Sequence, residues 1–297
     1  MKFSVIIPNL NTPVLNKTIN SLIAQSLIPE LFEIIVVGRD DIQAMAPNSR
    51  VLFDVTERPF SPAEARNRGA QHALGEFLVF LDADCICPPD WLGTLDQLLE
   101  SREFDMVGGG VGTTTDNYWT LSDNLSMFHE FMSWQPAGHR SCFPSLNLAI
   151  RRSAFESVGG FDQSYPVPSG EDMELTQRLA KAGYIGWFEP TFWVRHEPTR
   201  YSFFHLLKHG FIQGKYSTKI RFPDQPGSFP SWLRNPWSLR LFSPMLSLVI
   251  VIKIFCQSQH RKFIYTLPAV FASKLSWCFG AASSPAWKQD FGQRQMK

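Results

Sequence analysis

Two acidic segments, far apart in the chain, contain the residue types that metal binding and proton transfer require. The first, Asp82-Ala83-Asp84, directly follows the uninterrupted apolar run 77–81. Two carboxylates one residue apart can hold a hard divalent cation, which in turn can bind a diphosphate. Such a pair also occurs in solvated turns, so its meaning depends on its surroundings. Arg66 and Asn67 lie upstream, where a guanidinium and an amide could contact a nucleotide's phosphates and base.

The second acidic segment is Gly170-Glu171-Asp172, at the expected start of a helix over 171–182. A carboxylate there can act as a general base that takes the proton of an attacking hydroxyl. Acidic residues in a first turn also complement the helix dipole, which is the purely structural alternative. His196 follows a short expected strand at 192–194. It can be a metal ligand or a hydrogen-bonded loop histidine.

The elements that must position these residues alternate between short apolar strands and helices. Strands are expected at 3–7, 33–37, 51–55 and 77–81, and Ser61 with Glu64 forms a capping box for a helix that runs to about His72. Continuous apolar strands separated by helices predict a parallel sheet covered on both faces. In such a sheet the ligand crevice lies at the carboxyl ends of the strands. The sequence therefore predicts an α/β domain whose site includes the Asp82–Asp84 turn.

The order of the motifs resembles family 2 glycosyltransferases over about residues 3–200. The motifs are Pro8-x-x-Asn11, Ala65-Arg66-Asn67-Arg68-Gly69, Gly75 to Asp84, Asn147 to Arg152, Val158 to Asp162, and Gly170 to Leu175 followed by Arg178. The resemblance implies the A-type glycosyltransferase fold, with a Rossmann-like nucleotide-sugar-binding sheet and helices on both faces. It also implies a nucleotide-diphosphate sugar as donor, Mn²⁺ or Mg²⁺ as metal, and inversion at the anomeric carbon.

The resemblance also implies roles for individual residues around the metal and the acceptor. Asp84 corresponds to the main metal ligand, and Asp82 to a residue near the donor ribose and the metal. His196 occupies a position that supplies a third metal contact in many relatives. Asp172 corresponds to the catalytic base, with Glu171 beside it in the acceptor region.

Around the nucleotide, the resemblance places Pro8 and Asn11 along the cleft and brings Arg66 and Asn67 toward the base and phosphates. The chain departs from the family after the second strand, where an Asp-Asp pair usually recognises the base. Here the sequence is Val37-Gly38-Arg39-Asp40-Asp41. Either Asp40 fulfils this role from a longer loop, or base recognition differs. The Gln-x-x-Arg-Trp signature of processive synthases is absent from the sequence, which favours transfer of a single sugar.

The two parts of the chain differ in charge. Residues 1–199 carry 25 acidic and 14 basic side chains, a net charge of −11, whereas residues 200–297 carry 2 acidic and 14 basic ones, a net charge of +12. This division predicts a catalytic domain over 1–200 and a basic helical region over 201–297. The five scattered cysteines argue against a disulfide framework.

The basic region over 201–297, called the rear region below, contains two apolar stretches, 241–255 and 263–282. They could be buried helices of a soluble protein. The basic charge favours interfacial or re-entrant helices on an anionic membrane, with Arg240, Lys253 and Lys274 among the side chains that extend toward headgroups. The first stretch is short for a clean membrane span, and Pro268 and Lys274 interrupt the second.

These observations predict an inverting, metal-dependent glycosyltransferase that transfers one sugar to a hydroxyl acceptor. The acceptor is expected to be a lipid-linked or envelope glycan precursor, met at the cytoplasmic side of the cell membrane, and no nucleic-acid partner is expected. The apolar run before Pro8 is too short for a secretory signal, so the catalytic part should stay in the cytoplasm. The alternative is a catalytically silent relative that binds a nucleotide sugar or acts as a scaffold. A dinucleotide-dependent oxidoreductase is excluded, because Pro8-Asn9-Leu10-Asn11 replaces the required glycine-rich turn.

Overall fold

The computed structural model describes residues 1–44, 48–114, 116–221, 233 and 235–285. The chain divides into two compact units. The first comprises Met1–Thr113 and Glu130–Pro198, and the second comprises Thr114–His129 and Thr199–Lys297. The second unit begins close to the boundary expected at residue 200, and it also includes a short segment from the middle of the chain.

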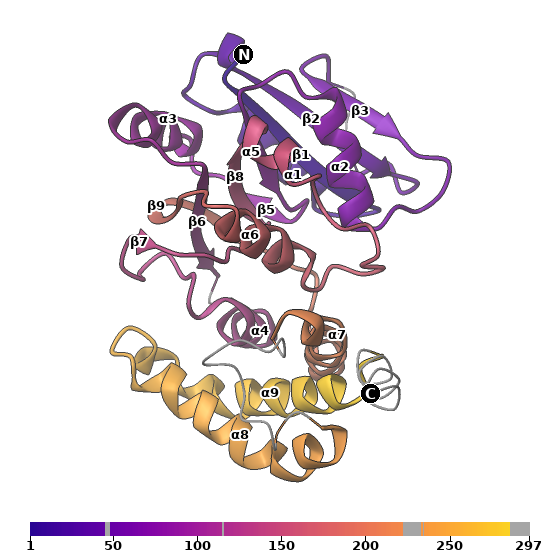
Figure 1. The fold of residues 1–297 in the computed structure, drawn as a ribbon, viewed down its shortest axis with the longest axis vertical. Helices are drawn as coiled ribbons and strands as arrows, with labels where there is room; N and C mark the ends of the chain where they lie inside the picture. The colour runs from indigo at the N-terminus through magenta and orange to yellow at the C-terminus, as the bar shows by residue number, and fades with distance from the viewer. Residues whose placement is uncertain (45–47, 115, 222–232, 234, 286–297) are drawn as a thin grey trace. The chain divides into compact units, whose positions relative to one another are not determined.

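The first unit is built on a mixed sheet whose strands follow the order β3-β2-β1-β4-β8-β6-β9-β5, with β7 paired to β9 (Figure 1). The strands are β1 (Phe3–Leu10), β2 (Phe32–Arg39), β3 (Val51–Val55), β4 (Phe77–Leu81), β5 (Cys85–Ile86), β6 (Met106–Thr113), β7 (Gly138–His139), β8 (Asn147–Arg151) and β9 (Gly186–His196).

The predicted parallel pairing is confirmed for the first four predicted strands, but the complete sheet is mixed. β1 pairs in parallel with β2 and β4, and β2 with β3, but β8 runs antiparallel to both β4 and β6. An apolar run identifies a strand buried on both faces without specifying its direction. β8 carries such a run, Asn147–Arg151, and is inserted between strands of the opposite direction.

Helices and one 3₁₀ turn connect the strands of the first unit. They are α1 (Leu15–Ile23), η1 (Pro29–Leu31), α2 (Pro62–His72), α3 (Trp91–Ser101), α5 (Arg152–Ser157) and α6 (Glu171–Lys181). The predicted capping box of α2 is present: Glu64 N donates to Ser61 Oγ at 3.3 Å, and Ser61 N donates to Glu64 Oε2 at 2.8 Å. α2 packs on β1 and β2 so closely that a Cβ at Gly69 would lie 2.4 Å from Ile6 Cγ2. Gly69 therefore lets the helix that carries Arg66 lie directly on the sheet.

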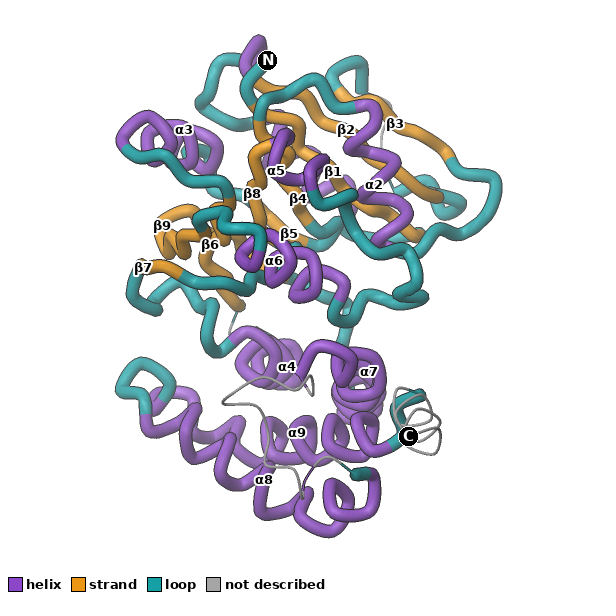
Figure 2. Tube along the Cα trace, viewed as in Figure 1, coloured by secondary structure: helices purple, strands orange, loops and turns teal. Residues whose placement is uncertain are grey.

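The described elements of the second unit are helical (Figure 2). They are α4 (Tyr118–Phe128), α7 (Phe203–Arg221), α8 (Pro236–Cys256), η3 (Arg261–Thr266) and α9 (Leu267–Ala282). α4 lies in a part of the chain where no helix was predicted. It joins this unit through Asp123, which is fully buried and accepts from Arg200 Nε at 2.7 Å and lies 2.8 Å from His209 Nδ1.

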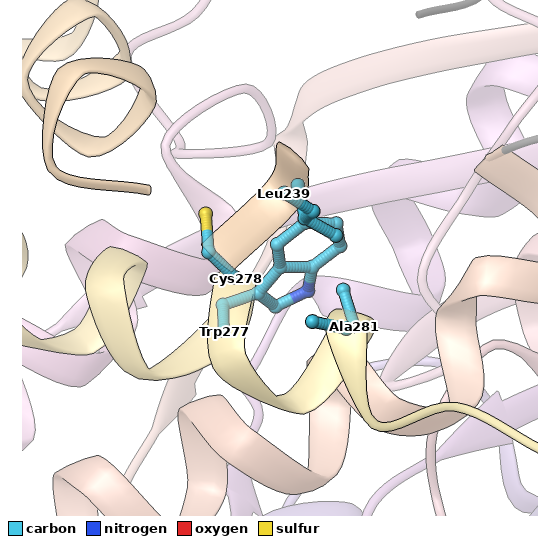
Figure 3. Close-up of a cluster of buried hydrophobic side chains, with 5 residues drawn as sticks. Leu239, Trp277, Cys278 and Ala281 are labelled. Atoms are coloured by element: carbon cyan, nitrogen blue, oxygen red, sulfur yellow. The ribbon is translucent and has the colours of Figure 1, made fainter. Parts of the chain in front are cut away.

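α9 is the core helix of the second unit and packs against α4, α7 and α8. Figure 3 shows the Trp277 ring of α9 against Leu239 of α8, with Cys278 and Ala281 beside it. On the α7 side, a Cβ at Gly214 would lie 2.0 Å from the Trp277 carbonyl oxygen. Small residues thus allow close approach of the helices, as at helix contacts in membranes.

These helices correct three expectations for the rear region. The first apolar stretch belongs to a 21-residue helix, α8, which is long and apolar enough to cross a membrane by length and composition, although a buried core helix passes the same test. The second stretch forms α9, which is largely buried within its unit rather than interfacial. Lys274 donates to the Ser126 carbonyl of α4 and does not extend toward headgroups.

Candidate active site

The Asp82–Asp84 segment forms a tight turn directly after β4, in the first unit. Cys85 N donates to the Asp82 carbonyl at 3.1 Å, which closes the turn. Thr18 of α1 donates from Oγ1 to the Ala83 carbonyl at 2.8 Å, and both atoms are buried. α1, the helix that follows β1, therefore holds this turn in place through the Thr18 hydroxyl. The side chains of Asp82 and Asp84 remain 34% and 20% exposed, so both can be reached from solvent.

Arg66 connects this turn to the start of α6. Its Nη2 donates to Asp82 Oδ1 at 2.8 Å, and its Nη1 donates to Glu171 Oε1 at 2.8 Å. The Arg66 side chain is only 2% exposed and the Glu171 side chain 3%. A buried guanidinium needs compensating carboxylates, and Arg66 receives them from two segments that are distant in sequence. This contact brings the two predicted acidic segments into one site.

The start of α6 requires a glycine. Gly170 is the residue before the helix and has φ of +94°, a conformation that costs a residue with a Cβ about 1–2 kcal/mol. The first two side chains of α6, which follow Gly170, lie in different surroundings. Glu171 is buried against Arg66, whereas Asp172 is half-buried and faces the segment that contains Ser145.

The Asp172 carboxylate is held by backbone amides. Its Oδ2 accepts from Ser145 N at 3.0 Å, and its Oδ1 accepts from Met173 N at 2.8 Å. Burial raises the pKa of Asp172 above its usual range, while these two amides and the positive charge of Arg66 act in the opposite direction. A carboxylate with a raised pKa and a fixed orientation is suited to accept a proton.

The pKa of Glu171 is raised to about 7. The largest cause is burial, followed by the negative charge of the neighbouring Asp172, and Arg66 opposes both. Two adjacent carboxyl groups with raised pKa values in one site are typical of functional sites, although ion-pair networks also produce such shifts.

Asp84 and His196 come together at the pairing of two strands. β5 runs antiparallel to β9 with Cys85 opposite His196, and Asp84 Oδ1 lies 3.5 Å from His196 Nε2. A carboxylate oxygen and an imidazole nitrogen at this separation can both be ligands of one divalent cation such as Mn²⁺. Asp82 is less available as a metal ligand, because its Oδ1 accepts a hydrogen bond from Arg66. Within the described residues, no group of three or more His, Cys, Asp or Glu side chains is arranged to hold a metal ion.

The predicted nucleotide-binding residues lie at the carboxyl ends of β1 and β2. Pro8 pairs with Val37 in the sheet register. Asn11, which has φ of +56°, donates from Nδ2 to Asp41 Oδ2 at 3.0 Å and accepts from Asp41 N at 2.6 Å. Asp40 accepts from Ala44 N at 2.8 Å within its own loop. Asp41, which was not among the predicted site residues, therefore joins the two strand ends together with the bonds from Asn9 Nδ2 and Asn11 N to the Arg39 carbonyl.

Asn67 has a different environment from Arg66. Its Nδ2 donates to the Phe161 carbonyl at 2.8 Å, and its Oδ1 accepts from Phe161 N at 2.9 Å. The amide thus fixes the Gly160–Phe161 turn to α2 through both of its polar atoms. Its predicted contact with the nucleotide stays a prediction, but the observed role is to hold this turn.

Sequence reasoning missed Thr18, Ser145 and Asp41, which position the predicted site residues. Thr18 had a readable signal, because it shares the buried face of α1 with Leu15 and Leu22 and a polar residue on such a face needs a partner. Ser145 had no local signal: it donates to Asp172 Oδ2 from its backbone amide at 3.0 Å and from its hydroxyl at 3.4 Å, across 27 residues of sequence.

The sequence comparison decides the family. Residues 4–159 match the profile described as "Glycosyl transferase family 2". The chain belongs to glycosyltransferase family 2. This confirms the family resemblance of the motifs, and the site described above lies in the first unit of this glycosyltransferase.

Two curated relatives illustrate the range of similar proteins. The chain is 35% identical over 162 residues to N-acetylglucosaminyl-diphospho-decaprenol L-rhamnosyltransferase of Mycobacterium tuberculosis, covering 53% of this chain and 50% of that protein. It is 26% identical over 280 residues to the succinoglycan biosynthesis protein ExoM of Rhizobium meliloti, covering 87% and 86%. For other relatives the matched share of their length falls to 38% and 16%, so the chain spans only part of several relatives.

Solved structures show the same fold. The mannosyltransferase PcManGT from Pyrobaculum calidifontis, in complex with GDP-Man and Mn²⁺, has a TM-score of 0.57 at 18% identity, covering 92% of this chain and 85% of that one. GalNAc-T7 with UDP, GalNAc and Mn²⁺ has a TM-score of 0.54 at 16% identity, covering 83% and 50%. The mixed sheet with flanking helices is therefore the predicted A-type glycosyltransferase fold.

Proposed function

We propose that this family 2 glycosyltransferase transfers one sugar, with inversion, from a nucleotide-diphosphate sugar to a hydroxyl acceptor. The observation that carries the proposal is the double contact of Arg66, which joins the Asp82 turn to the first residues of α6. A donor diphosphate near the turn and an acceptor hydroxyl near α6 would then lie at neighbouring positions. Both PcManGT and GalNAc-T7 were solved with a nucleotide or nucleotide sugar and Mn²⁺, which supports the class of donor.

Asp172 is the proposed general base. The acceptor oxygen attacks the anomeric carbon while its proton passes to the Asp172 carboxylate, and the bond from that carbon to the diphosphate oxygen breaks. The nucleoside diphosphate leaves with the bonding electron pair. Attack opposite to the leaving group inverts the anomeric configuration. The amides of Ser145 and Met173 orient the carboxylate for this transfer.

Glu171 and Arg66 are proposed to position the site rather than to take the proton. Arg66 keeps Asp82 at the β4 turn and Glu171 at the acceptor side. Pro8, Asn11 and Asp40 lie at the strand ends where the nucleotide is proposed to bind.

Asp84 and His196 are the proposed protein ligands of Mn²⁺ or Mg²⁺, with Asp82 close by. When bound, the metal would neutralise charge on the diphosphate leaving group. The separation of 3.5 Å between the Asp84 and His196 atoms supports this assignment.

The proposed acceptor is a lipid-linked or envelope glycan precursor at the cytoplasmic side of the cell membrane. The names of two relatives, a diphospho-decaprenol rhamnosyltransferase and a succinoglycan biosynthesis protein, support this class. The 21-residue apolar helix α8 supports a membrane location. Incubation with a panel of radiolabelled nucleotide sugars, Mn²⁺ and bacterial lipid extract tests the proposal. Transfer of label to the lipid fraction supports it, and an inactive chain that only binds nucleotide sugar supports the scaffold alternative.

A further inference from the structure

The outward face of α8 carries a row of exposed apolar side chains. Six exposed apolar side chains recur at helical spacing along it: Trp237 (78% exposed), Leu241 (74%), Met245 (49%), Leu248 (49%), Val249 (59%) and Ile252 (52%). We call these six residues the α8 stripe. The buried side chains of α8 are Leu239, Ser243, Ser247, Val251, Ile254 and Phe255, so the helix is apolar on its exposed face as well as on its buried one. A surface helix of a water-soluble protein carries charged and polar side chains on its outward face instead.

Basic side chains flank the α8 stripe. Arg240, Lys253, Arg261 and Lys262 are exposed on α8 and η3, and Ile264 and Tyr265 of η3 are exposed at 51% and 53%. Residues 199–221, 233 and 235–285, the described part of the chain after Pro198, contain no acidic side chain. The α8 stripe is bordered by cations and has no carboxylates on the same elements. This combination is complementary to an anionic lipid leaflet, which offers apolar chains and negatively charged headgroups.

The spacing of the charges argues for insertion along the surface. Twelve residues separate Arg240 from Lys253, which corresponds to roughly 18 Å of helix. The hydrocarbon core of a bilayer is about 30 Å thick. α8 also packs on α9 through Leu239, Trp277 and Ala281 (Figure 3). One face is therefore occupied by protein, and only the opposite face is available to lipid.

We propose that the α8 stripe inserts into the headgroup and acyl-chain boundary of an anionic membrane, with α8 parallel to the surface. This proposal deepens the proposed membrane location of the enzyme, and it does not depend on sugar transfer. The stripe supplies the apolar contact, and Arg240, Lys253, Arg261 and Lys262 supply attraction to anionic headgroups.

The test is co-sedimentation of the full chain with vesicles of phosphatidylcholine alone or mixed with phosphatidylglycerol, at low and high salt. The unmodified protein should bind the mixed vesicles, and each basic residue should contribute about fivefold. Leu241→Glu with Val249→Glu should weaken binding at least tenfold. The matched control is Ile28→Glu with Val55→Glu, two residues exposed at 58% and 66% in the first unit, which should leave binding unchanged. Lys253→Gln with Lys262→Gln should reduce binding mainly at low salt.

A second measurement does not depend on how the charged variants fold. Brominated acyl chains should quench part of the tryptophan fluorescence of the unmodified protein, and Trp237→Phe should remove that part. The proposal is overturned if the unmodified chain does not bind mixed vesicles, or if the Glu variant binds them equally well. It is also overturned if the Glu variant changes only the oligomeric state measured by light scattering, because the stripe would then be a contact between copies of the chain. Sugar transfer to a soluble acceptor, measured in parallel without vesicles, reports separately on the proposed function.

Discussion

Arg66 Nη1 lies 2.8 Å from Glu171 Oε1, across 105 residues of sequence. The same guanidinium contacts Asp82 at 2.8 Å, so one buried side chain holds together the end of β4 and the start of α6. Those two segments carry the proposed metal ligand Asp84 and the proposed base Asp172. The geometry of the site therefore depends on a residue that need not touch the reacting atoms.

Replacing Arg66 by Ala should destabilise the fold strongly. The change leaves the buried Glu171 carboxylate without its cation, and breaking a buried ion pair typically costs about 3–5 kcal/mol. Arg68→Ala is the matched control on the same helix, because Arg68 is 44% exposed and pairs with Asp54 at the surface, where such pairs contribute up to about 1 kcal/mol. Urea unfolding at about pH 8, above the raised pKa of about 7 at which Glu171 ionises in the folded protein, measures both variants. Equal losses of unfolding free energy would show that the Arg66 contacts do not organise the site.

Asp172→Asn should fold and bind donor but transfer sugar about 10²–10⁴-fold more slowly, because it removes the basic carboxylate with little change of shape. Asp90→Asn, at an exposed residue without a side-chain cap to α3, is the control and should leave the rate unchanged. Steady-state rates with donor affinity measured separately check the prediction. A variant that retains most of its turnover would assign proton transfer to another group.

The stability of the protein should fall as the pH rises from about 4.5 toward about 7, in part because of Glu171. Burial raises the pKa of Glu171 to about 7 from an ordinary value of 4.5. In this interval the unfolded chain releases the proton while the folded chain keeps it, so the folded state loses stability with increasing pH. Glu171→Gln cannot ionise and should flatten this dependence. Unfolding free energies of both proteins at about pH 5 and about pH 8 give the comparison, and an identical pH dependence would rule out this role for Glu171.

The elements of the site were more predictable than their contacts. The apolar run of β4 and the Ser61–Glu64 capping box of α2 are local patterns, and the structure contains both. The helix α4 was missed even though Asn117 caps it, accepting from Trp119 N at 2.9 Å and Thr120 N at 3.1 Å. A single cap without a clear apolar stripe predicts a helix only weakly.

Long-range relationships could not be predicted, because no local pattern specifies them. The direction of β8 and the pairing of Arg66 with Glu171 both depend on how distant segments meet. The same holds for the rear region, where the charge predicted a membrane surface but could not separate the buried helix α9 from the exposed stripe of α8. Periodicity tells which residues share a face, and only packing decides which face is covered.

Asp84→Ala should abolish the Mn²⁺-dependent part of donor binding, since His196 alone cannot hold the cation against water. His196→Gln should weaken the same part less, because Asp84 retains the carboxylate. Asp90→Ala is the control. Calorimetric titration with nucleotide sugar, with and without Mn²⁺, distinguishes metal-dependent from metal-independent affinity. Unchanged metal dependence in Asp84→Ala would place the cation elsewhere.

The most direct measurement is the release of nucleoside diphosphate from a panel of nucleotide sugars, with acceptor lipid extract and Mn²⁺. Unmodified protein, Asp172→Asn and Asp84→Ala are compared under the same conditions. We expect metal-dependent turnover of one donor by the unmodified protein and a loss of about 10²-fold or more in Asp172→Asn. Turnover that both variants retain, or that continues without any divalent cation, would contradict the assignment of this site as the catalytic centre.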